Sequence, residues 1–299
     1  MAFPPRTGYN FVSTLHQQVP DNMSPAKQSL PAPFVVCITG ASRGIGAETA
    51  KTFAAAGATG LILTARTEAA LEKTKEACQA IAKSSDLKIS TLGADASSPG
   101  SAQRLAKLIE QDHARLDLLI NNAGLMASDS SAFGRLGDIR DDQFELPMQI
   151  NTIGRMLTTK YLLPLLLKSE NGAKTIINIT SLSSHLTFGT PIPFNISELA
   201  TNRLTEAVAQ QYADDGVLAY AVHPGTVRDS DFPAGFPEMF KQGCNDEPDL
   251  CGAFCLWLVM DRREWLSGRY LAANWDVKEL ERRKEEIVEK DLLKMRMSV

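Results

Sequence analysis

The stretch FVVCITGASRGIG, residues 34–46, decides the fold because a short apolar run leads directly into a glycine-rich turn. Its first six residues have the apolar character of a buried strand. Gly40, Gly44 and Gly46 follow in a Gly-x-x-x-Gly-x-Gly spacing, and an alanine-rich helical segment comes next. Glycines let the backbone approach a diphosphate closely, while a helix N-terminus offers free N–H groups. The stretch therefore predicts a strand, a phosphate-binding loop and a helix, in that order.

Strand-type and helix-type segments alternate along the rest of the chain. Further β-type runs occupy residues 61–65, 88–94, 116–124, 174–181 and 217–225, with 269–276 as a seventh. Helical patterns run from the glycine-rich turn to residue 57 and over 68–83, 102–113, 143–168 and 196–213. A kink or break is expected near Pro164. Strands separated by helices form βαβ units, so we expect an α/β fold with a doubly wound parallel sheet and helices on both faces.

One domain with appendages is expected. Residues 1–33 are rich in Pro, Ser and Gln, which predicts an irregular N-terminal arm on the surface. Residues 34–276 form the domain, in which the Pro-, Gly- and acid-rich segment 226–249 is a loop or lid. Residues 277–299 form a charged helical tail that packs on the body or on a neighbouring subunit. The apolar stripe of this tail consists of Val277, Leu280, Ile287 and Leu292.

Composition excludes several classes of function. The 299 residues are 44% hydrophobic and 22% charged, as in a globular protein with a sizeable core. A net charge of −4 leaves no basic excess to neutralise nucleic-acid phosphates. No apolar run approaches the ~20 residues of a membrane span. Five scattered cysteines and the lack of a signal-peptide layout favour a cytoplasmic location. Cys251 and Cys255 would share a helix face without further ligands nearby, so no metal site is expected.

Two charged positions indicate which dinucleotide binds. Arg66 ends the second strand, where an adenosine ribose would lie, and together with Arg43 it could grip a 2′-phosphate. An acidic residue ending that strand would instead favour the bare ribose of NAD. Asp95, at the end of the third strand, can accept a hydrogen bond from the adenine amino group. NADP(H) is therefore the expected cofactor.

The ordered set of motifs resembles the short-chain dehydrogenase/reductase superfamily. TGASRGIG is followed by Asp95, NNAG (121–124), Asn151, NITS ending in Ser181, and HPG (223–225), in the family's order and spacing. The resemblance covers about residues 34–276 and implies a Rossmann-type fold that assembles as a homodimer or homotetramer. It implies cofactor contacts at Gly40, Ser42, Arg43, Gly44, Ile45, Gly46, Arg66, Asp95, Ala96, Asn122, Ala123, Gly124, Pro224, Gly225, Thr226 and Val227.

The catalytic residues that the resemblance implies are replaced in part. The family uses a Ser, an Asn, a Tyr that donates a proton to a carbonyl, and a Lys four residues after the Tyr. Ser181 and Asn151 occupy the first two positions, but Phe194 and Glu198 stand at the Tyr and Lys positions. The last Thr of the downstream Pro-Gly motif is Asp229. Every departure thus falls on the nicotinamide half of the site.

These replacements oppose ordinary ketone reduction. Phenylalanine has no proton to give, and a carboxylate about 4 Å from a developing alkoxide costs on the order of 4 kcal/mol at an effective dielectric of about 20. That cost is roughly a thousandfold in rate. Glu198 is a candidate general acid or base with a raised pKa, and the alternative is a surface glutamate in the first turn of a helix. His185, four residues after Ser181, is a second candidate acid or base.

Three hypotheses remain open for the activity. The leading one is a redox-neutral reaction (cyclisation, isomerisation or dehydration) in which NADP(H) need not be consumed. The second is an NADPH-dependent reduction of an activated electrophile such as an iminium ion, which a carboxylate would stabilise. The third is a non-catalytic NADP-binding protein.

A group of apolar residues clusters in the two segments that border the substrate site in the resembled family. They suggest a largely apolar small organic substrate, and the two ends of the chain are similar to those of fungal members in secondary metabolism. The residues are Phe188, Pro191, Pro193, Phe194, Phe232 and Phe236.

Overall fold

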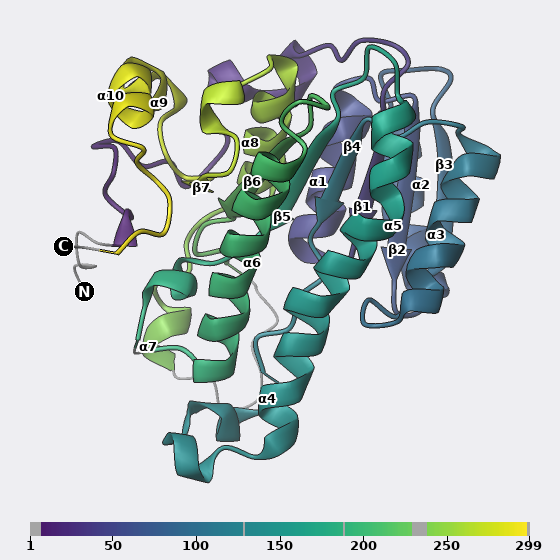
Figure 1. The fold of residues 1–299 in the computed structure, drawn as a ribbon. Helices are drawn as coiled ribbons and strands as arrows, with labels where there is room; N and C mark the ends of the chain where they lie inside the picture. Colours follow the sequence, from purple (N-terminus) through teal and green to yellow (C-terminus); the bar gives the residue numbers. More distant parts are fainter. Residues whose placement is uncertain (1–6, 128, 188, 229–237, 298–299) are drawn as a thin grey trace.

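A seven-stranded parallel sheet forms the centre of the protein (Figure 1). The computed structural model describes residues 7–127, 129–187, 189–228 and 238–297. The strand order is β3-β2-β1-β4-β5-β6-β7, and every neighbouring pair is parallel. The strands are β1 (Val35–Thr39), β2 (Gly60–Ala65), β3 (Lys88–Gly93), β4 (Leu118–Asn121), β5 (Thr175–Ile179), β6 (Leu218–His223) and β7 (Tyr270–Ala272). All seven predicted strands are confirmed, and so is the doubly wound α/β class.

Helices cover both faces of the sheet because its strands bury side chains on both sides. Within β1, Val36 and Ile38 belong to one apolar cluster, while Val35 and Cys37 belong to the other. The first cluster includes α1 (Gly44–Ala55), α2 (Glu72–Ile81) and α8 (Asp249–Met260). The second includes α3 (Pro99–Asp112), α5 (Arg155–Lys168) and α6 (Ile192–Gln211). Figure 1 shows α5 and α6 on the near side of the sheet, with α1 behind it.

The predicted long helix over residues 143–168 is interrupted at a different place from the one expected. It consists of α4 (Asp141–Pro147), a π-helical segment (Met148–Gly154) and α5. Of the kink or break expected near Pro164, the break does not occur, since α5 runs through this residue to Lys168. Pro164 removes the hydrogen bond to the carbonyl of Lys160, and both residues are exposed. Water can therefore satisfy that carbonyl.

α6 begins four residues before its predicted start. It starts at Ile192, and Pro193 fits the first turn because the N–H that proline lacks has no partner there. Glu198 consequently lies in the second turn, and the expectation of a first-turn glutamate on the surface is wrong.

The two ends of the chain pack against each other beside β7. The tail forms two short helices, α9 (Val277–Arg282) and α10 (Lys284–Glu289), whose apolar stripe is buried in the core except for the partly buried Leu292. The described part of the arm has two three-residue 3₁₀ turns, Asp21–Met23 and Pro25–Lys27. Its hydroxyl groups at Ser13 and Thr14 donate to the carboxylate of Glu279. The tail thus packs on the body of the domain, which is one of the two arrangements expected from the sequence.

Part of the expected lid lies outside the described residues. Within it, the structure places a short α7 (Glu238–Lys241) and a bridge between Val227 and Asp246. Residues 229–237, with the predicted site positions Asp229, Phe232 and Phe236, are not described, and neither is Phe188. No helix among the described residues is long and apolar enough to cross a membrane.

The close contact between α1 and α8 predicts a sensitive glycine. A Cβ on Gly252 of α8 would lie 2.6 Å from Thr52 Oγ1 and 2.9 Å from Thr49 Cα. The Gly252→Ala variant is therefore expected to lose about 1–3 kcal/mol of unfolding free energy, measured by urea titration. Gly137→Ala is the control, because a Cβ there meets nothing within 4 Å. Its stability should stay within about 0.5 kcal/mol of the wild type, and equal stability of both variants would contradict the prediction.

Candidate functional site

The predicted dinucleotide loop lies at the carboxyl edge of the sheet. Sheet order reverses between β1 and β4, and the crevice at such a switch point is the usual ligand site in open α/β sheets. Gly40 and Gly44 both have positive φ angles, 67° and 54°. An L side chain would be strained at either position. The local backbone therefore requires the glycines that the sequence supplies.

Asn122 fixes this loop through its side chain. Its Nδ2 donates to the carbonyls of Thr39 at 2.9 Å and Gly40 at 3.0 Å. A Cβ on Gly46 would lie 2.4 Å from the Gly40 oxygen and 2.5 Å from Asn122 Nδ2. The backbone N–H groups of Asn122 and Ala123 both donate to Thr39 Oγ1, at 3.0 Å each. Asn122, one of the predicted cofactor residues, thus holds the loop in its conformation through its side-chain amide.

The loop fits a diphosphate. Helix α1 starts at Gly44, and the side chain of its N-cap residue, Arg43, forms no capping hydrogen bond. A Cβ on Gly44 would meet nothing within 4 Å, which leaves open space beside the first turn. Ser42 and Ile45 are partly buried on either side. Uncapped N–H groups and the positive end of the helix dipole can accept an anion here.

The charged residues that the sequence predicted for an adenosine end are exposed beside this loop. Arg66 is exposed directly after β2, and Arg43 is exposed in the loop. Asp95 is exposed beyond β3, and its Oδ1 accepts hydrogen bonds from Ser97 N at 2.9 Å and Ser97 Oγ at 2.7 Å. These bonds, followed by the charge of Arg66, lower the pKa of Asp95 below its ordinary value. The carboxylate is therefore ionised and able to accept a hydrogen bond. Ala96 follows it directly, and its carbonyl packs against Gly154.

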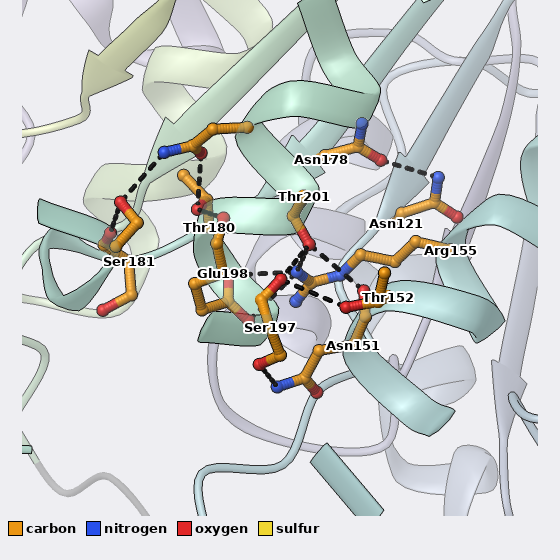
Figure 2. Close-up of polar contacts among 12 residues, drawn as sticks. Asn121, Asn151, Thr152, Arg155, Asn178, Thr180, Ser181, Ser197, Glu198 and Thr201 are labelled. Carbon is orange, nitrogen blue, oxygen red and sulfur yellow. Dashed lines mark hydrogen bonds and ion pairs between the residues drawn. The ribbon is translucent and has the colours of Figure 1, made fainter. Parts of the chain in front are cut away.

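The inner face of α6 is polar and buried beside the expected catalytic centre (Figure 2). Glu198 is 1% exposed, and both of its carboxylate oxygens accept a hydrogen bond from Arg155 Nη1 at 3.0 Å. Burial raises the pKa of the Glu198 carboxyl, and the guanidinium opposes this rise. Glu198 thus has a guanidinium partner, at a position where the sequence predicted an anion in place of a cation. Other buried polar residues of this face are Ser197, Thr201, Asn202 and Thr205.

Arg155 is a site residue that the sequence analysis missed. It is 4% exposed and comes from α5, one turn after Asn151. Residues four apart in a helix share a face, so the spacing from Asn151 was the available signal. Its Nη1 also donates to Thr201 Oγ1 at 2.9 Å. A cation thus enters the site from a different helix from the one on which the family's lysine was expected.

The amide of Asn151 is fully engaged within the protein. Its Oδ1 accepts from Leu125 N at 2.8 Å, and its Nδ2 donates to Leu125 O at 2.9 Å and to Ser197 Oγ at 3.0 Å. The backbone carbonyl of Asn151 accepts from Thr201 Oγ1 at 3.2 Å. The residue therefore ties the loop after β4 to α6.

Ser181 lies on a loop that α6 holds in place. Its Oγ accepts from Ser183 N at 3.1 Å, and its carbonyl accepts from Ser184 Oγ at 2.6 Å. Asn202 of α6 donates in turn to Ser184 Oγ at 2.9 Å. The hydroxyl proton of Ser181 has no acceptor among the described residues. Ser181 can therefore donate a hydrogen bond to a ligand oxygen.

Phe194 is partly buried in the first turn of α6, one turn before Glu198. Its carbonyl accepts a hydrogen bond from Ser197 Oγ at 2.8 Å. The aromatic ring carries no group that can donate a proton. The structure thus gives this position no acid to replace the expected phenol.

The Pro-Gly loop has an acidic partner that the sequence analysis also missed. Asp246 Oδ2 accepts from Thr226 N at 2.7 Å, and a Cβ on Gly225 would lie 2.5 Å from the same oxygen. Gly225 has a φ of 99°, while Pro224 and Val227 are buried. Partial burial raises the pKa of Asp246. The resemblance assigned Thr226 to the cofactor, and the backbone N–H of this residue already has an acceptor in Asp246.

Two neutral histidines lie behind the Ser181 loop. Burial lowers the pKa of His185 to about 4 and that of His223 to about 3. His185 packs edge-on against the ring of Tyr270, with ring centroids 4.4 Å apart. His223 Nδ1 accepts from Leu182 N at 3.2 Å, so its proton is on Nε2, which has no partner among the described residues. Both imidazoles are therefore neutral at pH 7.

Two cavities lie away from this edge of the sheet. A cavity of about 570 Å³ is lined by residues from the C-terminal half of α6 and the tail, including Glu206 and Arg296. One of about 490 Å³ lies at the amino edge, beside Phe34 and Asp117. Neither is lined by a predicted site residue. Over the described ranges, no group of three or more His, Cys, Asp or Glu side chains could hold a metal ion.

The depressed pKa of His223 predicts a pH-dependent stability. Below pH 6.5 the unfolded chain binds a proton that the folded chain excludes, so the unfolding free energy falls as the pH drops from about 6.5 toward about 4. In His223→Asn this contribution is removed, while the asparagine oxygen can still accept from Leu182 N. We expect the variant's unfolding free energy, measured by urea titration at several pH values, to fall less steeply over this range. If the unfolding free energies of the wild type and the variant fell equally over this pH range, the depressed pKa assigned to His223 would be contradicted.

Comparisons with known proteins agree with this geometry. The family model for short chain dehydrogenases matches residues 34–238. The chain is 38% identical to the short chain dehydrogenase pgmD of Aspergillus terreus over 301 aligned residues, covering 99% of this chain and 96% of that protein. It is 38% identical to the short chain dehydrogenase citE of Monascus ruber, covering 99% of each. It is 32% identical to the short chain dehydrogenase andI of Emericella variicolor, covering 97% of each.

A solved structure shares the fold. The short-chain type dehydrogenase/reductase from Mycobacterium marinum has a TM-score of 0.70 at 21% identity, covering 82% of this chain and 94% of that one. The matched family model and the relatives along almost the whole chain show that this protein belongs to the short chain dehydrogenase family.

Proposed function

We propose that this protein binds NADP(H) and converts a largely apolar small organic molecule without net oxidation or reduction. Cyclisation, isomerisation and dehydration are the reaction types in this class. The observation that carries the proposal is Phe194 at the position of the family's proton donor, beside Glu198, whose two carboxylate oxygens both accept from Arg155. Fungal secondary metabolism, in the cytoplasm, is the proposed setting.

The adenosine end supports NADP(H) over NAD. Family membership and the fold imply a nicotinamide nucleotide. Two exposed guanidinium groups, those of Arg43 and Arg66, follow β1 and β2, and no carboxylate ends β2. Guanidinium groups bind phosphate oxygens in pairs of parallel hydrogen bonds, which suits a 2′-phosphate. When bound, the nicotinamide supplies the capacity for hydride transfer.

The ion pair changes the reason why ketone reduction is disfavoured. The expected penalty from an unpaired Glu198 is offset, because Arg155 neutralises the carboxylate. The missing acid remains, since Phe194 cannot protonate a developing alkoxide. A redox-neutral reaction that passes through an enolate-like oxygen needs a hydrogen-bond donor at that oxygen and a neutral base. Ser181 provides a hydroxyl proton that has no acceptor among the described residues. The pKa of His185, lowered by burial to about 4, makes this imidazole a weak base.

The alternative hypotheses are less well supported. Reduction of an iminium ion relied on a free carboxylate, but both oxygens of Glu198 accept from Arg155. A non-catalytic binding protein would not need the rigid hydrogen-bonded loop that orients Ser181. The first alternative would consume NADPH, and the second would show no turnover.

The surface suggests self-association through α5 and α6. Met156, Ile196 and Leu199 are apolar and 41%, 43% and 38% exposed. Met156 lies on α5, and Ile196 and Leu199 lie on α6. We propose a homodimer or homotetramer.

The role of Arg66 predicts a change of cofactor preference. Arg66→Asp removes the 2′-phosphate contact and adds a carboxylate, so the Kd for NADPH should rise at least about tenfold while the Kd for NADH should not rise. Fluorescence titration of each reduced nucleotide measures this. Arg282→Asp is the control, since Arg282 is an exposed arginine of α9, remote from the loop (Figure 1). An equal loss of NADH affinity in Arg66→Asp would contradict the NADP assignment.

Turnover tests the reaction class directly. The purified protein is incubated with NADPH and apolar carbonyl-containing candidate substrates, while NADPH absorbance and product mass are followed together. We expect product with the mass of the substrate, or of the substrate less one water, and no loss of NADPH. Ser181→Ala should slow this reaction by about 10²–10³, the usual effect of removing one oxyanion donor. Product two hydrogens heavier with equimolar NADPH loss would establish a reductase and overturn the proposal.

A further inference from the structure

Arg155 makes its ion pair through one nitrogen. Nη1 donates to both oxygens of Glu198 at 3.0 Å and to Thr201 Oγ1 at 2.9 Å. Two N–H bonds thus serve three acceptors. Nε is buried without a hydrogen-bond partner among the described residues, and Nη2 donates to none of them either. Most of the donor capacity of this guanidinium is therefore unused.

A second arginine shows how this protein builds a structural ion pair. Arg115 donates from Nε to Asp117 Oδ2 at 2.9 Å and from Nη2 to Asp117 Oδ1 at 2.6 Å. Asp117 is fully buried and also accepts from Val35 N at 2.8 Å. The parallel two-nitrogen arrangement is the strong one for guanidinium and carboxylate. If the Arg155–Glu198 pair served packing alone, the same two-nitrogen arrangement would be expected there.

The unused Nη2 points toward the crevice. A Cβ on Gly124 would lie 3.2 Å from Arg155 Nη2 and 3.5 Å from Asn151 Oδ1. Gly124 is exposed at the carboxyl end of β4. The preceding Ala123 is in contact with the diphosphate loop, since a Cβ on Gly40 would lie 2.9 Å from Ala123 Cα. The guanidinium thus reaches the wall of the crevice just beyond the loop.

The sheet order shows which half of a dinucleotide would lie there. Arg66 and Asp95 follow β2 and β3, on one side of β1, and they fit the adenosine end. Gly124 follows β4, on the other side of β1. A dinucleotide whose diphosphate lies on the loop after β1 therefore extends its nicotinamide half toward β4 and Arg155.

We propose that Arg155 contacts the cofactor, with Nη2 donating to the hydroxyl oxygens of the ribose in the nicotinamide half. Glu198 is then a positioning residue that holds the guanidinium in place. Figure 2 shows Arg155 crossing from α5 to Glu198 on α6. The inference rests on the proposed function, in which the protein binds a nicotinamide dinucleotide. It assigns the ion pair a role in binding that dinucleotide.

Binding of two nucleotides tests this assignment. The double variant Arg155→Met, Glu198→Gln removes both charges and so leaves no unpaired buried ion. We expect its Kd for NADPH to rise about tenfold or more, while its Kd for 2′,5′-ADP, which lacks the nicotinamide half, stays within about twofold of the wild type. Retained 2′,5′-ADP affinity also shows that the variant is folded. Calorimetric titration measures both constants.

Arg203→Met, Glu206→Gln is the matched control, because it removes an ion pair of α6 that lies away from the crevice. Its Kd for NADPH should stay within about threefold of the wild type. Unchanged NADPH affinity in the Arg155→Met, Glu198→Gln variant would overturn the proposal, and so would an equal loss of affinity for both nucleotides, which indicates a purely structural pair. NADPH consumption during turnover would instead refute the redox-neutral function and leave these binding constants unaffected.

Discussion

A carboxylate buried between two helices requires a cation beside it, and this constraint organises the centre of the protein. Glu198 is 1% exposed on the inner face of α6. Removing such a charge from water costs several kcal/mol, and removing one partner of a buried pair typically costs about 3–5 kcal/mol. Arg155 of α5 supplies the cation at 3.0 Å. The two helices that cover this face of the sheet are therefore fixed relative to each other at the site.

Hydrogen bonds extend this constraint to the loops at the carboxyl edge. Asn151 joins the loop after β4 to Ser197, and Asn202 joins α6 to Ser184 in the loop after β5. Thr201 bonds both to Arg155 and to the backbone of Asn151. Loops that would otherwise move are thus held by a single buried polar face of α6. A ligand would meet a crevice whose wall is already formed.

The sequence was sufficient for the fold and for the conformation of the glycine-rich loop after β1. Those features depend on backbone geometry, and glycine spacing and apolar periodicity report backbone geometry directly, as at Gly40 and Gly44. It was insufficient for the catalytic half, because Arg155 and Asp246 act through contacts between distant segments. Their partners, Glu198 and Thr226, lie 43 and 20 residues away along the chain. Only the packing of α6 against the π-helical segment that leads into α5 brings Arg155 to Glu198, so motif register at residue 198 alone predicted an anion and gave no sign of its cationic partner.

The family's lysine would stand on α6, whereas here α6 carries Glu198 and the cation comes from Arg155 of α5. This arrangement separates two properties that a lysine on α6 would combine. A lysine there would place a cation near the proton-donating position and near the cofactor ribose at once. With Glu198 on α6 and Arg155 on α5, the positive charge is displaced toward Gly124 and the diphosphate loop. Phe194 removes the group whose pKa such a cation would lower. Under the proposed function, loss of the phenol and displacement of the cation are consistent changes: neither supports proton delivery to a carbonyl oxygen, and the proposed role of Arg155 retains a donor for the cofactor.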